Sequence, residues 1–333
     1  MPADTGAESK KGAVTLRALI TGIGGFAGSH LAKHLLDAGK EVSGTLSPRG
    51  GTENLAGIEQ QCHLLRLDLT DYASVRHALD EQAPDAIFHL AARASVPAAW
   101  SDPAATLQNN VIAQLNILRA LAEAGATPRI LIVASADEYG RVRPEDLPVD
   151  EDTPLRPVNP YAVSKVTQDY MGLQYYLSHR LPIVRVRPFN HAGPRQEKGF
   201  VVSDFASQIA DIERCVQAPV LSVGDLSAER DFSDVRDVVR AYDLALRHGE
   251  PGEVYNVGSS KAVPVKHVLD LLLSMSRAEI TVTQDAARMR PSDIPRIVSD
   301  CSRLHGATGW CPTVPLEKTL ADTLEYWRAR TAR

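Results

Sequence analysis

Cysteine is scarce in this sequence, and it is not spaced as metal or disulfide sites require. The 333 residues contain four cysteines: Cys62, Cys215, Cys301 and Cys311. No two of them form a C-x-x-C pair, and no pair of histidines lies near them in the sequence. This spacing indicates neither a disulfide framework nor a zinc site, so we expect no bound metal. Unpaired thiols are typical of a reducing compartment, and we expect a cytoplasmic protein.

Long hydrophobic runs and basic blocks are also missing. The first residues, MPADTGAESKKG, are polar, and the later apolar runs are no longer than a strand. We therefore expect no signal peptide, no membrane span, and a disordered tail over residues 1–13. The net charge is −5, so nothing in the chain attracts nucleic acid or an anionic membrane non-specifically.

What the sequence does contain is an alternation of short apolar strands and helices. Hydrophobic residues make up 44% of the chain, enough for a large core. Helical stretches near residues 73–81 and 106–124 separate runs that are typical of buried strands: TLRALIT, EVSGTL, HLLRLDL, DAIFHLAA and RILIVAS. This alternation predicts an α/β protein with a Rossmann-type, doubly wound parallel sheet.

The chain is less regular after the strand LPIVRVRPF. Helical segments near residues 205–215 and 265–276 stand among irregular stretches. We assign residues 14–188 to a nucleotide-binding domain, to which residues 231–260 return. Residues 189–230 and 261–330 are predicted to form a smaller, mixed α/β lobe for the substrate.

A glycine-rich turn joins the first strand to the first helix. Gly22, Gly25 and Gly28 have the spacing G-x-x-G-x-x-G. Glycine lets the backbone turn tightly and approach a pyrophosphate, and the following helix N-terminus offers amide donors to the anion. An ordinary strand-to-helix turn can have the same spacing, but the position after the first strand favours a dinucleotide site.

The end of the second strand indicates which dinucleotide is bound. An NAD-specific protein often has an acid here for the ribose hydroxyl, whereas this chain has Ser47, Pro48 and Arg49. Arg49 could pair with a 2′-phosphate, which favours NADP(H) over NAD(H), although a solvated loop arginine fits the same pattern. Asp68 and Leu69 end the third strand and are expected near the adenine.

Tyr161 and Lys165 lie one helical turn apart in the run NPYAVSKVTQDYM. This spacing puts both side chains on one helix face. A phenol has a pKa of about 10, and a neighbouring positive charge lowers that pKa by favouring the phenolate. The two residues could therefore transfer a proton at neutral pH. A surface helix in which they meet by chance is the alternative.

These motifs together resemble a known superfamily. The glycine turn, LAA at Leu90–Ala92, SADEYG from Ser135, and the pair Tyr161 and Lys165 occur in the order found in extended short-chain dehydrogenases/reductases. The later runs FNHAGPRQ, VGDLSAERDFSDVRDVV and RMRPSDIPRIVSD are similar to the group that contains GDP-mannose 4,6-dehydratase and GDP-4-dehydro-6-deoxy-D-mannose reductase. The stretch GFVVSDFASQIADIE resembles the reductase more closely.

The resemblance implies roles for the catalytic residues. Tyr161 would exchange a proton with the sugar C4 oxygen, and Lys165 would lower the pKa of Tyr161 and hold the nicotinamide ribose. Ser135 would hydrogen-bond the same C4 oxygen, and Asn110 would help to position the lysine. From the sequence alone, Ser135 could instead satisfy its own backbone and Asn110 could be solvated.

The resemblance also implies binding residues. The cofactor would contact Phe26, Leu90, Ala91, Ala92 and His191, although a lone histidine is more often structural. Five polar side chains would hold the substrate nucleotide: Asn190, Arg195, Arg230, Arg290 and Asp293. The arginine guanidinium is well suited to bind phosphate oxygens.

Asp137 bears on which of the two activities the chain has. A dehydratase needs a base for the C5 proton, and the group places a glutamate where this chain has Asp137, one methylene shorter. We therefore predict NADPH-dependent reduction of the C4 ketone of GDP-4-dehydro-6-deoxy-D-mannose to GDP-D-rhamnose. GDP-mannose 4,6-dehydratase with Asp137 as base is the alternative, and a non-catalytic NADP-binding sensor is a distant one.

A homodimer is the default for this superfamily. Residues 106–124 and 160–179 match the helices that pair across the usual dimer, although their apolar side chains could equally belong to the monomer core.

Overall fold

The computed structural model describes residues 16–285 and 294–330. The predicted tail over residues 1–13 lies outside the described residues.

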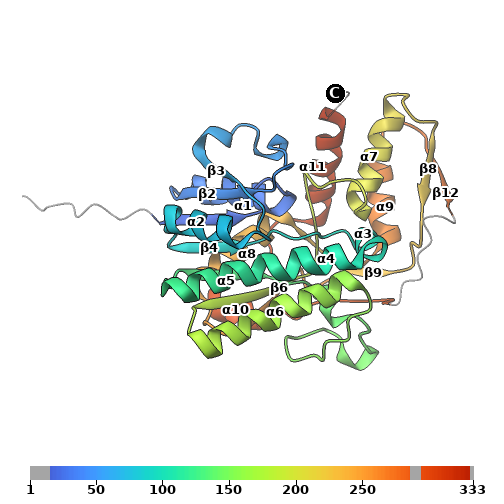
Figure 1. Cartoon of the computed structure of the whole chain (residues 1–333). Helices are drawn as coiled ribbons and strands as arrows, with labels where there is room; N and C mark the ends of the chain where they lie inside the picture. The colour runs from blue at the N-terminus through green and yellow to red at the C-terminus, as the bar shows by residue number, and fades with distance from the viewer. Residues whose placement is uncertain (1–15, 286–293, 331–333) are drawn as a thin grey trace, which may run out of the picture.

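The centre of the molecule is a seven-stranded sheet in the order β10-β6-β5-β4-β1-β2-β3, with every neighbouring pair parallel. The order reverses direction at β1, as in a doubly wound sheet, and this confirms the predicted fold class. Figure 1 labels β2, β3, β4 and β6 of this sheet. The strands are β1 (Arg17–Thr21), β2 (Glu41–Leu46), β3 (Cys62–Arg66), β4 (Ala86–His89), β5 (Arg129–Val133), β6 (Ile183–Pro188) and β10 (Val254–Val257).

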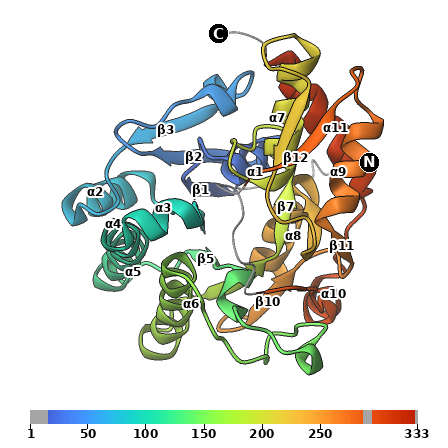
Figure 2. The ribbon, with the colours of Figure 1, turned by 90° about the vertical axis from the view of Figure 1, so that its right-hand side faces the viewer.

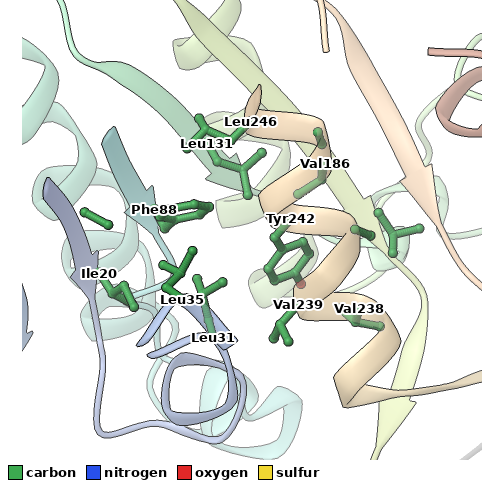
Figure 3. Close-up of a cluster of buried hydrophobic side chains, with 14 of the residues drawn as sticks. Ile20, Leu31, Leu35, Phe88, Leu131, Val186, Val238, Val239, Tyr242 and Leu246 are labelled. Carbon is green, nitrogen blue, oxygen red and sulfur yellow. The ribbon is translucent and has the colours of Figure 1, made fainter. Parts of the chain in front are cut away.

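Helices cover both faces of this sheet, as Figure 2 shows. One face carries α1 (Phe26–Asp37) and α8 (Val235–His248), and α10 (Ser302–Thr308) packs beside α8. The other face carries α2 (Tyr72–Gln82), α5 (Ala113–Ala124) and α6 (Pro160–His179). Buried apolar side chains fill both layers. Figure 3 shows the first layer, where Leu31, Leu35 and Tyr242 meet the sheet residues Ile20 and Phe88.

Local sequence determines where α6 begins and how closely it approaches the sheet. The Asn159 side chain accepts a hydrogen bond from the amide of Ala162 at 2.8 Å, and Pro160 occupies the first turn, so the helix begins directly before Tyr161. Eleven residues later, a Cβ atom on Gly172 would lie 2.6 Å from Cδ1 of Ile132 in β5. Only glycine lets the helix lie this close to the strand without displacing a buried side chain.

The predicted helix over residues 106–124 is interrupted in the structure. The chain runs through α3 (Val96–Ser101) and α4 (Pro103–Leu107), then through a π-helical segment (Gln108–Ile112), and only then into α5. Asn110 lies in the middle of the π-helical segment and is fully buried. Such bulges are frequent at functional sites.

A smaller, mixed α/β lobe is present, as predicted, and its first strand comes directly after β6. Its three-stranded sheet has the order β11-β9-β7, with β7 parallel and β11 antiparallel to β9, and β8 pairs with β12. Its helices α7, α9 and α11 enclose a separate apolar core (Figure 1). The elements are β7 (Asn190–Ala192), α7 (Val201–Glu213), β8 (Val220–Val223), β9 (Glu229–Asp234), β11 (Ala262–Pro264), α9 (Val265–Ser274), β12 (Thr281–Gln284) and α11 (Leu316–Ala329).

Candidate active site

Ser135 lies just beyond the carboxyl end of β5, where it caps the short helix η4 (Ala136–Tyr139). Its Oγ accepts a hydrogen bond from the amide of Asp137 at 3.2 Å, and its own amide donates to Oε1 of Glu138 at 3.1 Å. This is a capping box, S-x-x-E, so both ends of the turn are tied together. The backbone satisfaction considered from the sequence is therefore real, and it also fixes the direction of the Ser135 hydroxyl.

Tyr161 and Lys165 occupy the first two turns of α6, next to the Ser135 turn. The Ser135 side chain lies close enough to the Tyr161 phenol to lower its pKa. Lys165 is 3% exposed, and its Nζ donates to the carbonyl oxygen of Val133 at 2.8 Å and lies 6.0 Å from the centroid of the Tyr161 ring. The structure thus brings the three predicted catalytic side chains together at the carboxyl ends of the strands.

The expected lowering of the Tyr161 pKa by Lys165 is wrong for this structure. The pKa of Tyr161 is raised, first by burial and then by the charge of Asp137, while the hydrogen bond with Ser135 opposes the rise. The Lys165 ammonium is turned toward the Val133 carbonyl rather than the phenol oxygen. Burial lowers the pKa of Lys165 itself to about 8. The phenol is therefore held as a proton donor, with a poised ammonium beside it.

Asp137 is half-buried beside the catalytic side chains. Burial raises the pKa of this carboxyl, and the positive charge of Arg230 partly opposes the rise. Arg230 is also half-buried, its Nη1 donates to the carbonyl of Glu229 at 2.9 Å, and burial lowers its pKa. The charges of Asp137 from η4 and Arg230 from β9 thus influence each other across the site.

The glycine turn has the geometry of a pyrophosphate cradle. Gly22 has φ +73°, and a Cβ atom on Gly28 would lie 2.3 Å from the Gly22 carbonyl oxygen. Gly24, outside the predicted triplet, is equally constrained, because its Cβ would lie 2.7 Å from the Gly51 carbonyl oxygen. No side chain caps α1 at Gly25, so the first-turn amides face the turn. These features fit a dinucleotide at the N-terminus of α1.

The residues predicted near the adenosine lie at the ends of β2 and β3. Arg49 is exposed on the loop after β2, and Nη1 of Arg66 donates to the carbonyl of Gly50 at 2.6 Å, which braces that loop. Asp68 accepts from the amide and hydroxyl of Thr70 at 2.8 and 2.7 Å. The carbonyl of Leu69 accepts from Asn116 at 2.9 Å. The loop is therefore shaped by backbone contacts and leaves Arg49 at the surface.

A buried neutral network supports the segment Leu90–Ala92. Oγ1 of Thr21 accepts from the amides of Leu90 and Ala91, both at 3.1 Å, and lies 2.8 Å from Nδ1 of His89. The other ring nitrogen of His89 lies 3.3 Å from the side-chain amide of Gln168 on α6. Burial, and then the charge of Lys165, lower the pKa of His89 to about 3, so the ring stays uncharged. We call Thr21, His89 and Gln168 the neutral network.

Asn110, which is buried, and His191, which is half-buried, also lie around the site. Asn110 Oδ1 accepts from the amide of Arg93 at 2.7 Å, and its Nδ2 donates to Oγ of Ser164 at 2.9 Å, so its contact is with the residue before Lys165. The His191 ring stacks on Phe26, with centroids 5.7 Å apart and planes at 8°, and its Nδ1 lies 2.9 Å from the Phe189 carbonyl. Phe26 opens α1 directly after the glycine turn.

The predicted substrate residues are distributed between two places. Asn190 is exposed on β7 in the smaller lobe, beside β9, which carries Arg230. The Arg195 guanidinium instead donates to the carbonyl of Asn54 at 2.9 Å and lies 3.0 Å from Nδ1 of His30 on α1. Asn54 in turn donates to the Gly24 carbonyl at 3.1 Å, so Arg195 contacts the surroundings of the glycine turn. Arg290 and Asp293 lie outside the described residues.

Sequence reasoning missed a buried ionic network below Ser135. Asp169 on α6 pairs with Arg185 at 2.5 Å and with Arg187 at 2.7 Å, both on β6, and Arg187 lies 3.4 Å from Glu138. All four side chains are at most 6% exposed. The S-x-x-E spacing of Ser135 and Glu138 was a usable signal for the capping box. We call Glu138, Asp169, Arg185 and Arg187 the ionic network.

Over residues 16–285 and 294–330, three or more His, Cys, Asp or Glu side chains nowhere gather in a way that could hold a metal ion. In the same ranges, none of the helices has the length and apolar character needed to cross a membrane.

Comparison with known proteins identifies the family. The chain is 38% identical over 318 residues to GDP-6-deoxy-D-mannose reductase of Pseudomonas aeruginosa, covering 95% of this chain and 99% of that protein. It is 30% identical over 318 residues to GDP-mannose 4,6 dehydratase 2 of Arabidopsis thaliana, covering 90% and 84%. The structure of RMD from Pseudomonas aeruginosa complexed with NADPH matches with a TM-score of 0.83 and 37% identity, covering 95% of this chain and 100% of that one. Residues 19–323 match the family described as GDP-mannose 4,6 dehydratase, and the chain therefore belongs to this family of sugar-nucleotide enzymes, as its motifs predicted.

Proposed function

We propose that this chain is an NADPH-dependent reductase of GDP-4-dehydro-6-deoxy-D-mannose that produces GDP-D-rhamnose. The observation that carries the proposal is the meeting of Ser135, Tyr161 and Lys165 at the carboxyl ends of the strands, next to a glycine turn shaped for a dinucleotide. The similarity to GDP-6-deoxy-D-mannose reductase over 95% of the chain supports the choice of reaction.

The proposed mechanism assigns one task to each of these three side chains. NADPH, when bound, supplies the hydride for the C4 carbon of the sugar. Tyr161, whose raised pKa keeps it protonated, donates a proton to the C4 oxygen as negative charge builds there. Ser135 donates a hydrogen bond to the same oxygen, and Lys165 places a positive charge beside the phenolate that forms.

Cofactor and substrate would occupy opposite sides of this triad. The first turn of α1 would hold the pyrophosphate, and Arg49 would pair with the 2′-phosphate. Phe26, Leu90, Ala91, Ala92, Asn110 and His191 would surround the nicotinamide end, and Asp68 and Leu69 the adenine. In the smaller lobe, Asn190 and Arg230 would hold the GDP diphosphate, together with Arg290 and Asp293. Arg195 is better explained as a bond between this lobe and α1.

One experiment tests the reaction. Purified protein is mixed with GDP-mannose alone, and separately with the 4-keto sugar nucleotide plus NADPH, while absorbance at ~340 nm and product mass are followed. NADPH consumption only with the keto sugar is the expected result. Tyr161→Phe should lower kcat by roughly 10³-fold while the Kd for NADPH changes little. Full turnover by this variant would refute the assignment of Tyr161.

The dehydratase alternative rests on Asp137. Its carboxyl lies near Tyr161 and has a raised pKa, as a base for a carbon-bound proton requires. In the same experiment, conversion of GDP-mannose to a product lighter by one water, without net NADPH use, would establish this activity. Asp137→Asn should abolish such a conversion and leave ketone reduction within roughly three-fold of the wild type.

We further propose that the protein is a homodimer that pairs through α6. Val163, Tyr170 and Leu177 are 42%, 53% and 57% exposed, and they lie seven residues apart along one face of this helix. Trp100 on the adjacent α3 is 62% exposed. A stripe with this spacing is typical of helices that pack against a partner helix.

The dimer proposal predicts a change of molar mass on substitution. Tyr170→Glu places a charge in the stripe and should convert the dimer to a monomer in sedimentation equilibrium. Val216→Glu is the matched control, because Val216 is 71% exposed in the smaller lobe, away from α6. A monomeric wild type, or an unchanged mass for the Tyr170 variant, would count against the proposed interface.

The cysteines support the proposed cytoplasmic location. All four are free thiols in the structure, two of them exposed, which suits a reducing compartment.

A further inference from the structure

The most informative feature that the proposed function leaves unused is the ionic network. It joins the Ser135 turn to the helix that carries Tyr161 and Lys165. Asp169 follows Lys165 by four residues and Tyr161 by eight, so the three side chains lie along one face of α6. This face is turned to the carboxyl ends of β5 and β6.

The network forms a continuous chain of contacts from α6 to Ser135. Arg187 donates through Nε to Oδ2 of Asp169 at 2.8 Å, and it also donates to the hydroxyl of Tyr139 at 3.1 Å. Its Nε lies 3.4 Å from Oε2 of Glu138. Oε1 of Glu138 then accepts the amide of Ser135 at 3.1 Å. A second connection runs directly from Lys165 to the Val133 carbonyl on β5 at 2.8 Å.

We propose that Glu138 is a positioning residue, which holds the Ser135 hydroxyl at its working distance from Tyr161 through Arg187 and Asp169. Two independent connections between α6 and the end of β5 fix both the height and the rotation of the helix relative to Ser135. Catalytic geometry is sensitive to displacements of about 1 Å, so loss of either connection should slow the reaction. This inference rests on the proposed function only in that Ser135 must take part in the reaction.

The state of Glu138 agrees with this role. Glu138 is fully buried, and among the described residues its Oε2 has no hydrogen-bond partner, because the Arg187 contact does not meet hydrogen-bond geometry. Burial, and then the negative charge of Asp169, raise the pKa of Glu138 well above its usual range. A protonated Oε2 can donate toward Asp169, which leaves Oε1 free to accept from Ser135.

This state makes glutamine a close substitute for Glu138. Glu138→Gln keeps an acceptor for the Ser135 amide and supplies an N–H donor toward Asp169, whereas Glu138→Leu keeps the volume and removes both. We expect Glu138→Leu to lower kcat by roughly 100-fold with little change in the KM for NADPH. Glu138→Gln should remain within roughly three-fold of the wild type. The matched control is Glu145→Leu, at a carboxylate 63% exposed on the following loop, which should be unaffected.

A double-mutant cycle with Ser135→Ala decides whether Glu138 acts through Ser135. Ser135→Ala should lower kcat by roughly 100-fold, and adding Glu138→Leu should lower it by less than about three-fold more, because the positioned hydroxyl is already gone. Multiplicative losses, or a glutamine variant as slow as the leucine variant, would overturn the proposal. NADPH binding, followed by fluorescence, confirms that each variant is folded.

A folding failure of Glu138→Leu leaves the test intact. Glu138→Asp keeps a carboxyl in the network but withdraws it by one methylene, and it should lose roughly ten-fold in kcat, again without adding to the loss of Ser135→Ala. The wild type separates this inference from the proposed reaction. A wild type that does not reduce the keto sugar refutes the reaction, whereas an active wild type with multiplicative losses refutes only the role of Glu138.

Discussion

Two polar networks lie beneath the catalytic side chains, and they handle charge in opposite ways. The neutral network of Thr21, His89 and Gln168 lies on the β1 and β4 side of α6 and carries no charge at working pH, because burial keeps His89 unprotonated. The ionic network lies on the β6 side and pairs two arginines with Asp169.

The difference shows how the two sides of the site are used. On the neutral side, His89 adds no second positive charge beside Lys165, whose ammonium would otherwise be harder to keep protonated. On the ionic side, paired charges with fixed hydrogen-bond directions hold the Ser135 turn and α6 in one arrangement. The first network thus governs the charge of the site, and the second governs its geometry.

The largest effect on stability is expected in the ionic network. Asp169→Ala would leave Arg185 and Arg187 buried without their carboxylate, which should cost about 3–5 kcal/mol in the free energy of unfolding. Urea denaturation at neutral pH measures this cost. Asp270→Ala is the control, because the exposed pair of Lys266 and Asp270 should contribute less than about 1 kcal/mol. Equal costs for the two variants would show that the buried charges do not depend on Asp169.

An intermediate effect is expected from the buried Lys165 charge, which lies between the two networks. Its pKa is about 8 in the folded protein and about 10.4 in an unfolded chain. Between these values the unfolded state binds the proton and the folded state does not, so stability from this group rises with pH. From pH ~7 to ~9.5 the wild type should gain about 2 kcal/mol relative to Lys165→Met. Lys266→Met is the control: the Lys266 side chain is 65% exposed, and the wild type should show no such gain relative to this variant. Parallel pH curves for wild type and Lys165→Met would contradict the lowered pKa.

The smallest effect is expected in the neutral network. Thr21→Val removes the acceptor for the amides of Leu90 and Ala91, which should cost about 1 kcal/mol in stability because these half-buried amides can turn to water. If the freed segment shifts, the Kd for NADPH rises roughly five-fold. Thr21→Ser retains the hydroxyl, so its stability and its Kd for NADPH should stay close to those of the wild type. A valine variant with unchanged affinity would separate the network from cofactor binding.

The same contrast explains what could be predicted from the sequence. The parallel sheet follows from apolar runs of strand length, and the glycine turn from the steric demands at Gly22 and Gly28, so both were predicted correctly. These features depend on local chemistry. The family motifs then predicted Ser135, Tyr161 and Lys165, which the structure brings together.

Features that depend on distant partners were not predicted. The run IVRVRP alternates like a strand with one solvated face, yet Arg185 and Arg187 are 5% and 3% exposed, because Asp169 from α6 pairs with both. The π-helical segment at Asn110 likewise depends on contacts with Arg93 and Ser164, which cannot be predicted from the sequence of the segment itself. The pKa of Tyr161 was predicted in the wrong direction, because burial is a property of the whole fold.

Because α6 lies so close to β5 at Gly172, a larger residue at this position would tilt the helix about a point far from the catalytic side chains. Gly172 rests on Ile132, roughly 16 Å along the helix from Tyr161, given a rise of about 1.5 Å per residue over eleven residues. A single methyl group at position 172 would press on Ile132 and displace the N-terminal end of α6, where Tyr161 lies near the Ser135 hydroxyl. Small residues at this one position could therefore adjust the alignment of proton donor and acceptor while leaving every side chain in the site unchanged.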